Sequence, residues 1–427
     1  MRADPNGPAL PQIQEAAQRY SENARHKLAG LIHEAGPQGL PFARWMQAAL
    51  YDPQTGYYAG APLKFGDSTA AAGSALQGDF VTAPELTPWF GRSLARQIGP
   101  ILTHLNTPHI LEFGAGSGAL AEHILQALLP DFPELQYFIL DISPDLTQRQ
   151  KQRLAPFGDR VQWLQSLPTG FTGCIVANEV LDAMPVTLFE WGEDGNVYEL
   201  HVINKAGGAS AETDSQANQV PTAVAGSRQA NQDPAAESYF DFLRVPASPA
   251  VDQAVRARMP ALPGYRSEIN LQGESWVAGL GQWLDRGVAL LIDYGFPAGE
   301  YYHPQRSQGT LMCHLLHHAH SQVLHFPGIQ DITAHVDFTA MADAALAADL
   351  EVLGYTSQAR FLLNCGLLQM LEDLDPTDTV RYTREIGPVQ KLLSEAEMGE
   401  LFKVLAVGKN VDMDLDGFAT GDRRHRL

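Results

Sequence analysis

Short apolar runs alternate with helix-like patterns between residues 109 and 180, and this alternation restricts the fold more than any other feature of the chain. Helical patterns such as ALAEHILQALL separate the apolar runs HILEF, QYFILDI, VQWL and GCIVANEV, and VALLIDYG at 288–295 resembles a further buried strand. Runs of these lengths, joined by helices, are typical of right-handed crossovers in a parallel sheet that helices cover on both faces. The sequence therefore predicts a doubly wound α/β core.

The same patterns predict how the 427 residues are divided. We expect a flexible N-terminus at 1–24, a helical region with a lid at 25–105, a Rossmann-like core at 106–203, a disordered insertion at 204–237, and the remainder of the core with substrate-binding elements at 238–427. The insertion is predicted because Ala, Gly, Ser, Gln and Asn dominate it, and so few large apolar residues cannot offset the entropy of ordering. Before it, VTLFEW and VYELHVI flank the turn GEDGN and predict a hairpin.

The charge balance restricts the partners of the chain. It has 29 Lys and Arg against 49 Asp and Glu, a formal net charge of -20. Such a field repels phosphate backbones and anionic lipid, so we expect no nucleic-acid partner. No stretch has the roughly 18 uninterrupted apolar residues of a membrane span, so we expect no membrane insertion. A basic surface on a partner protein would be attracted.

Cysteines and histidines give no pattern typical of a disulfide or metal site. Cys174, Cys313 and Cys365 lie far apart in apolar contexts. The segment HLLHHAHSQVLH at 314–325 has histidines at helical spacing but no Cys or carboxylate, so we predict a polar loop or strand and no metal. Early acidic residues and the lack of an apolar core in the N-terminal segment fit neither a secretory signal nor a transit peptide. We expect a cytoplasmic protein.

The segment ILEFGAGSGAL at 110–120 places glycines at alternate positions between a strand and a helix. Such a loop lets backbone approach a ligand. Gly114, Gly116 and Gly118 fit the pattern of methyltransferases that use S-adenosylmethionine (SAM), whereas Gly114, Gly116 and Ala119 fit the relaxed dinucleotide fingerprint. The glycines alone therefore leave both cofactors open.

Two carboxylates near this loop restrict the choice. Glu112 precedes the first glycine by two residues, where it would repel a pyrophosphate but favour the positive sulfonium and ammonium groups of SAM. Asp141 ends the next strand and is placed to accept both hydroxyls of a ribose, a feature that the rival cofactors share. Asp141 is alternatively a structural residue that caps the following helix with Ser143.

A third group of polar residues follows the run GCIVANEV. Asn178 and Glu179 end this strand at the carboxyl edge, where doubly wound sheets bind substrate, and Asp182 follows one helical turn later. Amide and carboxylate oxygens can orient an N–H donor, so that its nitrogen is aligned for an in-line displacement at a methyl carbon. The alternative is a polar strand end that only caps a helix.

Five motifs in order resemble the family of MidA-like SAM-dependent methyltransferases, over about residues 25–410. They are GDFVTAPELTPWFG at 78–91, LEFGAGSG at 111–118, NEVLDAMPV at 178–186, IDYG at 292–295 and GIQDITAHVDFTAM at 328–341. The family includes the mitochondrial complex I assembly-factor arginine methyltransferase and many bacterial proteins. The resemblance implies a class I methyltransferase fold, a seven-stranded Rossmann-like sheet whose last strand is antiparallel. It also implies SAM as methyl donor and an arginine on a partner protein as acceptor.

The resemblance also implies roles for single residues. Gly114, Gly116 and Gly118 would form the cofactor loop, Asp141 would contact the ribose, and Asn178 with Glu179 would face the acceptor. The family often has Glu at the position of Asp141, so the ribose contact would here be made by a shorter side chain.

Two of these motifs contain further candidate residues. Thr82, Pro84 and Glu85 would form a lid over the cofactor, in which Glu85 would face the ammonium of the cofactor or the guanidinium of the substrate. The alternative is that Glu85 only starts a helix near 86–98. In DITAHVDF, the alternation predicts a half-buried strand with Thr333, His335 and Asp337 on its outer face. His335 and Asp337 are candidates to abstract or relay the acceptor's proton, because histidine titrates near neutral pH.

The sequence therefore favours a SAM-dependent methyltransferase that acts on arginine in a protein partner, such as a respiratory complex I subunit. Three alternatives stay open: an assembly chaperone that binds SAM without essential catalysis, a small-molecule methyltransferase, and an NAD-dependent oxidoreductase. The oligomeric state is also open, a homodimer included.

Overall fold

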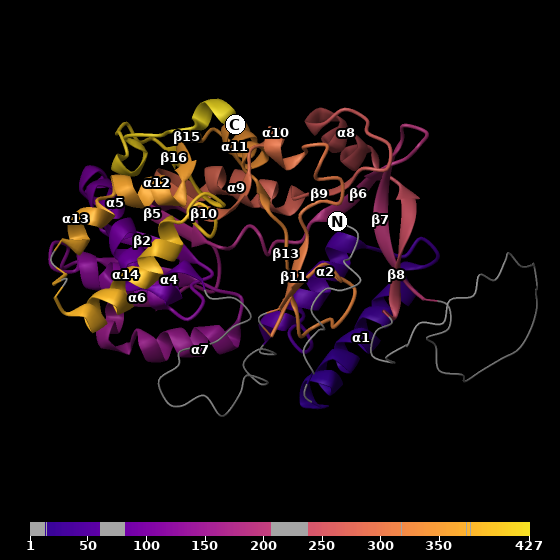
Figure 1. Cartoon of the computed structure of the whole chain (residues 1–427), viewed down its shortest axis with the longest axis horizontal. Helices are drawn as coiled ribbons and strands as arrows, with labels where there is room; N and C mark the ends of the chain where they lie inside the picture. The colour runs from indigo at the N-terminus through magenta and orange to yellow at the C-terminus, as the bar shows by residue number, and fades with distance from the viewer. Residues whose placement is uncertain are drawn as a thin grey trace, which may run out of the picture.

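Two lobes form the molecule in the computed structural model (Figure 1). The structure describes residues 13, 15–59, 82–205, 238–316, 318–372, 374–375 and 377–427. Most of the expected insertion at 204–237 and part of the expected lid lie outside these residues. The larger lobe holds the sheet predicted from residue 109 onward, and the smaller lobe combines N-terminal helices with a second sheet (Figure 1).

The large sheet has the topology that the sequence and the resemblance predict. Its main path runs β15 (Glu351–Ser357), β16 (Phe402–Lys409), β10 (Leu284–Phe296), β5 (Phe171–Asn178), β2 (His109–Phe113), β3 (Gln136–Leu140) and β4 (Val161–Trp163), and β14 (Val336–Asp337) pairs with β10. The strands from β10 to β4 are parallel, while β16 is antiparallel to both β10 and β15. The predicted class I methyltransferase fold, with one antiparallel last strand, is confirmed.

Helices cover both faces of this sheet, which explains why its strands are apolar throughout. One face packs against α5 (Pro88–Leu105), α6 (Ala119–Leu128), α12 (Gln358–Asn364), α13 (Leu367–Leu371) and α14 (Thr379–Leu393), and the other against α9 (Leu271–Trp283) and α11 (Phe338–Ala347). Neighbouring residues of β5 point to opposite faces, so that Cys174 and Val176 join the first core and Ile175 and Ala177 the second. Helix α7 (Pro144–Arg153) follows β3, and Ser143 caps it by accepting a hydrogen bond from the backbone N–H of Leu146.

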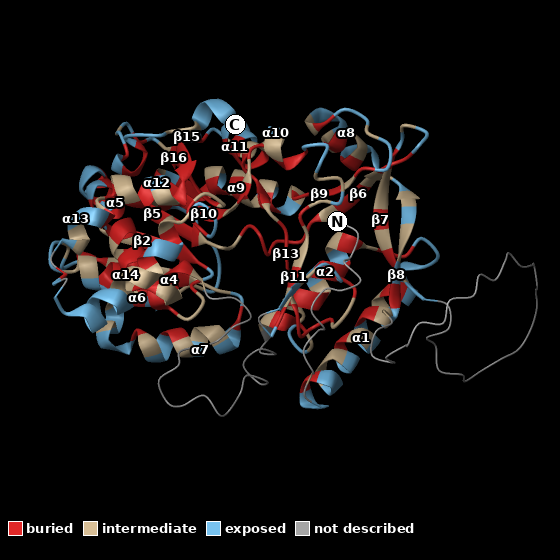
Figure 2. Cartoon of the chain, in the orientation of Figure 1, coloured by how far each residue is buried: buried red, intermediate tan, exposed pale blue. Residues whose placement is uncertain are grey.

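The smaller lobe contains elements that lie far apart in the sequence. Its five-stranded sheet contains β1 (Leu40–Pro41), β7 (Val197–Asn204), β6 (Thr187–Trp191), β9 (Arg266–Ile269) and β8 (Phe240–Pro246), covered by α1 (Glu15–Ala35), α2 (Phe42–Tyr51) and α8 (Pro249–Arg258). A three-stranded sheet of β12 (His318–His320), β11 (Met312–Leu315) and β13 (Asp331–Thr333) packs in the core of the smaller lobe, on the side of the larger lobe (Figure 1). Short helical segments complete the chain: α4 (Ala83–Leu86), α10 (Ala298–Tyr301), η1 (Tyr57–Ala59), η2 (Ala155–Arg160), η3 (Asp416–Phe418) and η4 (Arg424–Arg426). Figure 2 shows that buried residues fill both lobes.

Two expected boundaries differ from the structure. Residues 15–24 belong to α1, although the sequence suggests a flexible N-terminus up to residue 24, because Ala17 and Ala24 continue the buried face of Leu28 and Ile32. The predicted hairpin is present, as β6 pairs with β7, but it lies in the smaller lobe and not in the core assigned to 106–203. Within the described ranges, no helix has both the length and the hydropathy that crossing a bilayer requires.

Candidate functional site

A cavity of about 800 Å³ lies at the carboxyl edge of the large sheet, against the smaller lobe. In the sheet, β3 lies on one side of β2 and β5 on the other. The cavity lies at this switch point, where doubly wound sheets bind ligands. Six lining residues have carboxylates, whereas the described part of the lining contains no lysine or arginine. The carboxylates are Glu85, Glu112, Asp141, Glu179, Asp182 and Asp331. The cavity is therefore suited to a positively charged ligand.

The glycine loop between β2 and α6 forms one wall. Gly114 and Gly116 have φ values of 61° and 54° and line the cavity, while Gly118 starts α6 behind them and is not among the lining residues. The amide of Gln150 donates to the carbonyl of Gly116 at 2.9 Å and to Asp141 Oδ2 at 2.7 Å. Trp163 in turn donates its indole N–H to Gln150 Oε1 at 2.9 Å, so the loop and Asp141 are held by one network.

Glu112 and Asp141 end β2 and β3 beside this loop, as the sequence predicts. Glu112 is buried and accepts a hydrogen bond from the hydroxyl of Tyr137 at 2.8 Å. Burial raises the pKa of Glu112 to about 8, and the nearby Asp141 adds to this shift. Burial also raises the pKa of Asp141, although its Oδ1 accepts the backbone N–H of Ser143 at 2.9 Å. A cation in the cavity would favour the charged form of both carboxylates.

Asn178 and Glu179 lie at the end of β5, as predicted, in a turn with unusual backbone geometry. Glu179 has a φ of 53°, which is uncommon for a non-glycine residue and occurs often at functional sites. Its N–H donates to the carbonyl of Ile292 at 2.9 Å, and the amide of Asn178 donates to Glu179 Oε1 at 3.1 Å. Burial, followed by the charge of Asp182, raises the pKa of Glu179 to about 8. The strain and the hydrogen bonds fix the carboxylate at the cavity wall.

Asp182 follows this turn and is positioned through Asp293 of β10. Asp293 Oδ2 accepts the backbone N–H groups of Leu181 at 3.0 Å and of Asp182 at 3.2 Å. Burial raises the pKa of Asp182 to about 6, and burial together with the charge of Asp182 raises that of Asp293. Asp293 belongs to the IDYG motif, but the sequence pattern assigns no role to it because it lies within a buried strand.

Thr82 and Glu85 also line the cavity, beside the glycine loop. Glu85 belongs to α4, and it accepts a hydrogen bond from the hydroxyl of Ser117 in the loop. Arg153 lies 3.4 Å from Glu85 and 2.8 Å from Glu122. Glu85 is thus already paired with one cation of the chain, so it is a weaker candidate for holding a ligand cation than Glu112 or Glu179.

The structure corrects the prediction for the segment DITAHVDF. Its polar residues do not face solvent, because Thr333 and His335 line the cavity and Asp337 is buried. Burial lowers the pKa of His335 to about 4, so the ring is neutral and a weak base at neutral pH. Asp337 caps α11 by accepting the N–H of Ala340 at 3.1 Å and lies 3.9 Å from Arg258. These contacts give Asp337 a structural role at the start of α11.

The described residues of the histidine-rich segment belong to the end of β11, to β12 and to the turn that follows, as expected for a polar loop or strand. His314 lines the cavity, and burial lowers its pKa. In the portion of the chain that the structure describes, no three His, Cys, Asp or Glu side chains are grouped as metal ligands.

The sequence patterns do not identify the wall that the smaller lobe contributes. Tyr51 of α2, Tyr58 of η1 and Asp331 of β13 line the same cavity as Glu179, and the hydroxyl of Tyr58 donates to Asp331 Oδ1 at 3.1 Å. Tyr51 donates to the carbonyl of Ala183 at 2.8 Å and thereby connects the two lobes. The segment DPQTGYY is typical only of a turn, and no local pattern relates Tyr58 to a residue 273 positions later.

Two buried polar atoms at the cavity have no hydrogen-bond partner among the described residues. They are Asn178 Oδ1 and His335 Nδ1. Buried polar groups in folded proteins are normally paired, so these atoms indicate a place for a polar ligand or water.

The raised pKa values predict a pH dependence of stability in the ligand-free protein. The pKa of the Glu112 and Glu179 carboxyls is about 8 in the folded protein, whereas their ordinary pKa is 4.5. Between these two pH values, the folded protein therefore binds more protons than the unfolded chain. Their contribution to stability is complete below pH 4.5 and is lost as the pH rises towards 8. We expect calorimetry to give a lower melting temperature at about pH 8.5 than at about pH 5.5, with a smaller difference in Glu112→Gln. An equal difference in the variant would contradict this origin.

Comparisons with known proteins agree with this geometry. Residues 93–356 match the family model described as "Putative S-adenosyl-L-methionine-dependent methyltransferase". A solved Burkholderia thailandensis protein with bound S-adenosyl-homocysteine is 42% identical, with a TM-score of 0.84, and the match covers 98% of this chain and 100% of that one. A second structure from the same organism is 40% identical, with a TM-score of 0.83, over 98% of this chain and 100% of that one.

More distant relatives have names that specify an acceptor. The Drosophila melanogaster "Protein arginine methyltransferase NDUFAF7 homolog, mitochondrial" is 26% identical over 93% of this chain and 87% of its own length. The Xenopus tropicalis protein arginine methyltransferase NDUFAF7 is 25% identical over 88% of this chain and 83% of its own. The resemblance predicted from the sequence is confirmed, and so is SAM as the cofactor of the family. The chain belongs to the family of S-adenosyl-L-methionine-dependent methyltransferases that includes these bacterial and mitochondrial proteins.

Proposed function

We propose that the protein transfers a methyl group from SAM to a nitrogen of an arginine side chain in a partner protein. The observation that supports this most strongly is a cavity with six carboxylates and no lysine or arginine in its described lining. A sulfonium cofactor and a guanidinium acceptor are both cations, so a cavity of this charge favours the two together.

The residues beside the glycine loop fit this cofactor. Glu112 would lie near its positive groups, Gly114 and Gly116 would let the backbone approach, and Asp141 would accept the ribose hydroxyls. The same residues fit NAD poorly, because the described lining offers a pyrophosphate no lysine or arginine. SAM supplies a methyl group that is bound to a sulfonium sulfur. After the transfer, the rest of the cofactor leaves as a neutral thioether.

Glu179 and Asp182 have the chemistry needed at the acceptor. A guanidinium is protonated at neutral pH, so one nitrogen must become nucleophilic and give up a proton when the N–C bond forms. Carboxylates that accept N–H bonds from the other nitrogens concentrate the positive charge there. Burial raises the pKa of Glu179 to about 8 in the ligand-free protein, and bound cations would favour its ionised form. The ionised carboxylate would then accept the released proton and pass it to solvent.

The names of the mitochondrial relatives support arginine as the acceptor, at about a quarter sequence identity. A respiratory complex I subunit with an exposed arginine is the partner that we propose, and the net charge of -20 would attract a basic segment of it. We propose a cytoplasmic location for the reaction.

The proposal is tested by incubating the full-length protein with methyl-labelled SAM and cell lysate, and locating the label by mass spectrometry. We expect label on arginine of one or a few proteins, and none when SAM is replaced by S-adenosyl-homocysteine. Label on metabolites alone would instead support a small-molecule methyltransferase. SAM binding without any transferred label would support the assembly chaperone.

A further inference from the structure

His335 lies beside the acceptor side of the cavity, where Asp182 lies, but the proposed reaction gives it no task. It lines the cavity, and the neighbouring Ala334 donates its backbone N–H to the carbonyl of Asp182 at 2.9 Å. The Nδ1 atom of His335 is buried and has no hydrogen-bond partner among the described residues. A buried ring nitrogen without a partner at the wall of a cavity is placed to meet a ligand.

The tautomer of His335 follows from its contact with Thr310. A hydrogen bond with the backbone of Thr310 acts to raise the pKa of His335, which identifies the partner as a carbonyl that accepts a ring N–H. A neutral imidazole has one N–H donor and one acceptor nitrogen. Because Nδ1 has no partner, the donor is Nε2 and the free Nδ1 is the acceptor.

The loop at 302–311 between α10 and β11 fixes the backbone of His335. Thr310 Oγ1 accepts the N–H of His335 at 2.9 Å. The hydroxyl and the N–H of Thr310 donate in turn to Glu268 Oε1 at 2.6 Å and 2.9 Å, and the hydroxyl of Tyr301 donates to the same oxygen at 2.8 Å. Glu268 is buried in β9, so this network fastens His335 to the sheet of the smaller lobe.

An aromatic ring and two cations hold the imidazole of His335. His335 stacks on Phe296, with ring centroids 5.3 Å apart and planes 6° apart. Arg306 lies over the same Phe296 ring at 4.1 Å, and Lys403 lies over it at 5.9 Å. Burial and the charges of Arg306 and Lys403 lower the pKa of His335 to about 4. The imidazole is therefore both oriented and kept neutral.

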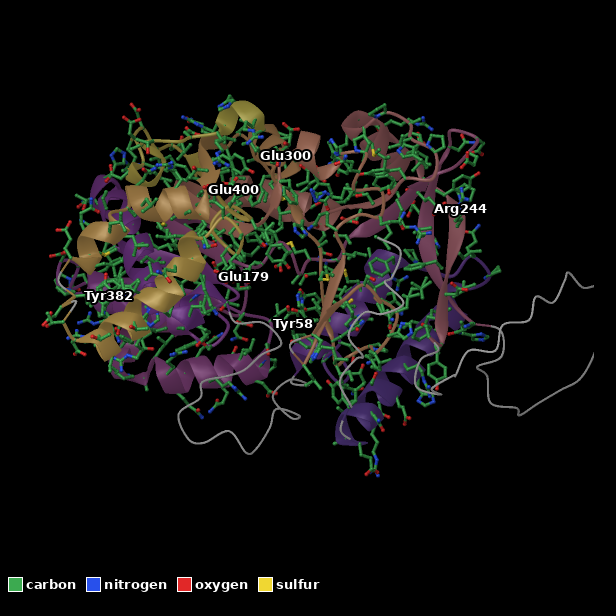
Figure 3. All side chains as sticks on the ribbon, in the orientation of Figure 1. Tyr58, Glu179, Arg244, Glu300, Tyr382 and Glu400 are labelled. Atoms are coloured by element: carbon green, nitrogen blue, oxygen red, sulfur yellow. The ribbon has the colours of Figure 1, made fainter. Side chains whose placement is uncertain are left out.

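The two cations differ in how they are paired. Lys403 Nζ lies 3.7 Å from Glu400 Oε1, and Figure 3 shows Glu400 on the same lobe as Glu179. Arg306 Nε is buried without a hydrogen-bond partner among the described residues. Its charge acts on Glu268 as well as on the imidazole. One explanation is that Arg306 only offsets the charge of Glu268, and its position over the stacked ring favours a second effect on the imidazole.

Other titratable groups near His335 show what Arg306 opposes. Tyr294 packs edge-on against His335 with ring centroids 5.0 Å apart, and burial raises the pKa of Tyr294, so its hydroxyl stays neutral. Asp182 is joined to the neighbouring residue of the strand, and Asp337 follows two positions later. Both carboxylates would favour a protonated imidazole, whereas Arg306 disfavours it.

We propose that Arg306 is a positioning residue that, through Phe296, keeps the ring of His335 neutral and oriented, so that Nδ1 accepts a hydrogen bond from an N–H group of the methyl acceptor. A protonated ring could only donate there and would repel a guanidinium. The proton that is released on transfer goes to Glu179, as in the proposed reaction. The inference rests on the proposed function and adds to it the groups that orient the acceptor nitrogen.

The test observes the ring directly, so it does not depend on methyl transfer. Full-length protein with nitrogen-15-labelled histidine, saturated with S-adenosyl-homocysteine, is titrated with acid and followed by NMR. The signal that is missing in His335→Gln belongs to His335. We expect a neutral ring with its proton on Nε2 above about pH 5. Added methylguanidinium should move the Nδ1 signal, because that nitrogen gains a hydrogen bond.

Variants of Arg306 test its effect on the ring. Arg306→Gln removes the charge, and the His335 ring should then titrate roughly one pH unit higher. Arg306→Lys keeps the charge and should restore a titration close to that of the wild type. Arg256→Gln is the matched control, because Arg256 lies over the ring of Trp191 at 4.9 Å and neither residue lines the cavity. This control should change nothing.

Retained binding of S-adenosyl-homocysteine shows that each variant is folded. If Arg306→Gln does not fold, the wild-type protein still decides: a His335 ring that is charged at about pH 6.5, or an Nδ1 signal that methylguanidinium does not move, overturns the proposal. An unchanged titration in folded Arg306→Gln also overturns it and leaves Arg306 as a partner of Glu268 alone. An unmoved Nδ1 signal alongside labelled arginine in lysate would leave the proposed function intact. A moved signal without labelled arginine would contradict the function alone.

Discussion

Replacing Glu179 by Gln is expected to lower the rate of methyl transfer by about 100-fold or more, since general acid–base groups contribute about this much. The amide keeps the size of the side chain but cannot accept the proton that the acceptor loses. It also cannot concentrate the positive charge of the guanidinium through a negative oxygen. The rate is measured with labelled SAM and the labelled partner identified in lysate, under saturating cofactor.

Binding of S-adenosyl-homocysteine to Glu179→Gln should change by less than about threefold, because the amide is nearly isosteric and only one charge is removed at the acceptor side. The exposed Glu397→Gln is the matched control and should keep the normal rate. A normal transfer rate in Glu179→Gln would contradict its assigned role. A cell that needs the protein but tolerates this variant after its activity is lost would favour the assembly chaperone.

Replacing Gly116 by Val is expected to weaken binding of S-adenosyl-homocysteine by roughly 30-fold or more, since a side chain that overlaps the ligand costs about 1–3 kcal/mol. Gly116 has a φ of 54°, and a Cβ placed there meets no atom of the described chain within 4 Å. The added side chain would therefore extend into the space of the cavity that a ligand needs. Isothermal titration calorimetry gives the affinity.

Gly264→Val separates the loss of ligand space from backbone strain. Gly264 has a φ of 75° and likewise has no atom within 4 Å of a Cβ, but it does not line the cavity. Both variants should lose stability, by about 1–3 kcal/mol for a side chain in the left-handed region. Only Gly116→Val should lose cofactor affinity, and similar losses in both would show that strain, and not the ligand site, is the cause.

The sequence predicts the core well because local patterns define it. The apolar runs of β2, β3, β5 and β10 and the glycine loop are continuous in sequence, and the carboxyl ends of parallel strands meet at one edge. Sequence reasoning alone can therefore assign Glu112, Asp141 and Glu179 to one cavity. The hairpin of β6 and β7 is also predictable, but periodicity does not tell which sheet a strand joins, and both strands lie in the smaller lobe.

The missed residues depend on contacts that no local pattern contains. Tyr51, Tyr58 and Asp331 reach the cavity only because α2 and β13 pack in one core of the smaller lobe. The alternation around His335 does predict which residues share a face, but not what covers that face. It suggests solvent, whereas Thr333 and His335 line the cavity, and burial there lowers the pKa of His335.

The central claim is that the cavity beside the glycine loop selects a cation, and direct titration of the purified full-length protein tests it. SAM and NAD share an adenosine but differ in charge, so calorimetry with each, at one pH and ionic strength, compares a sulfonium with a pyrophosphate at Glu112. We predict saturable binding of SAM and none of NAD. Binding of NAD that S-adenosyl-homocysteine displaces, at an affinity equal to or above that of SAM, would contradict the account.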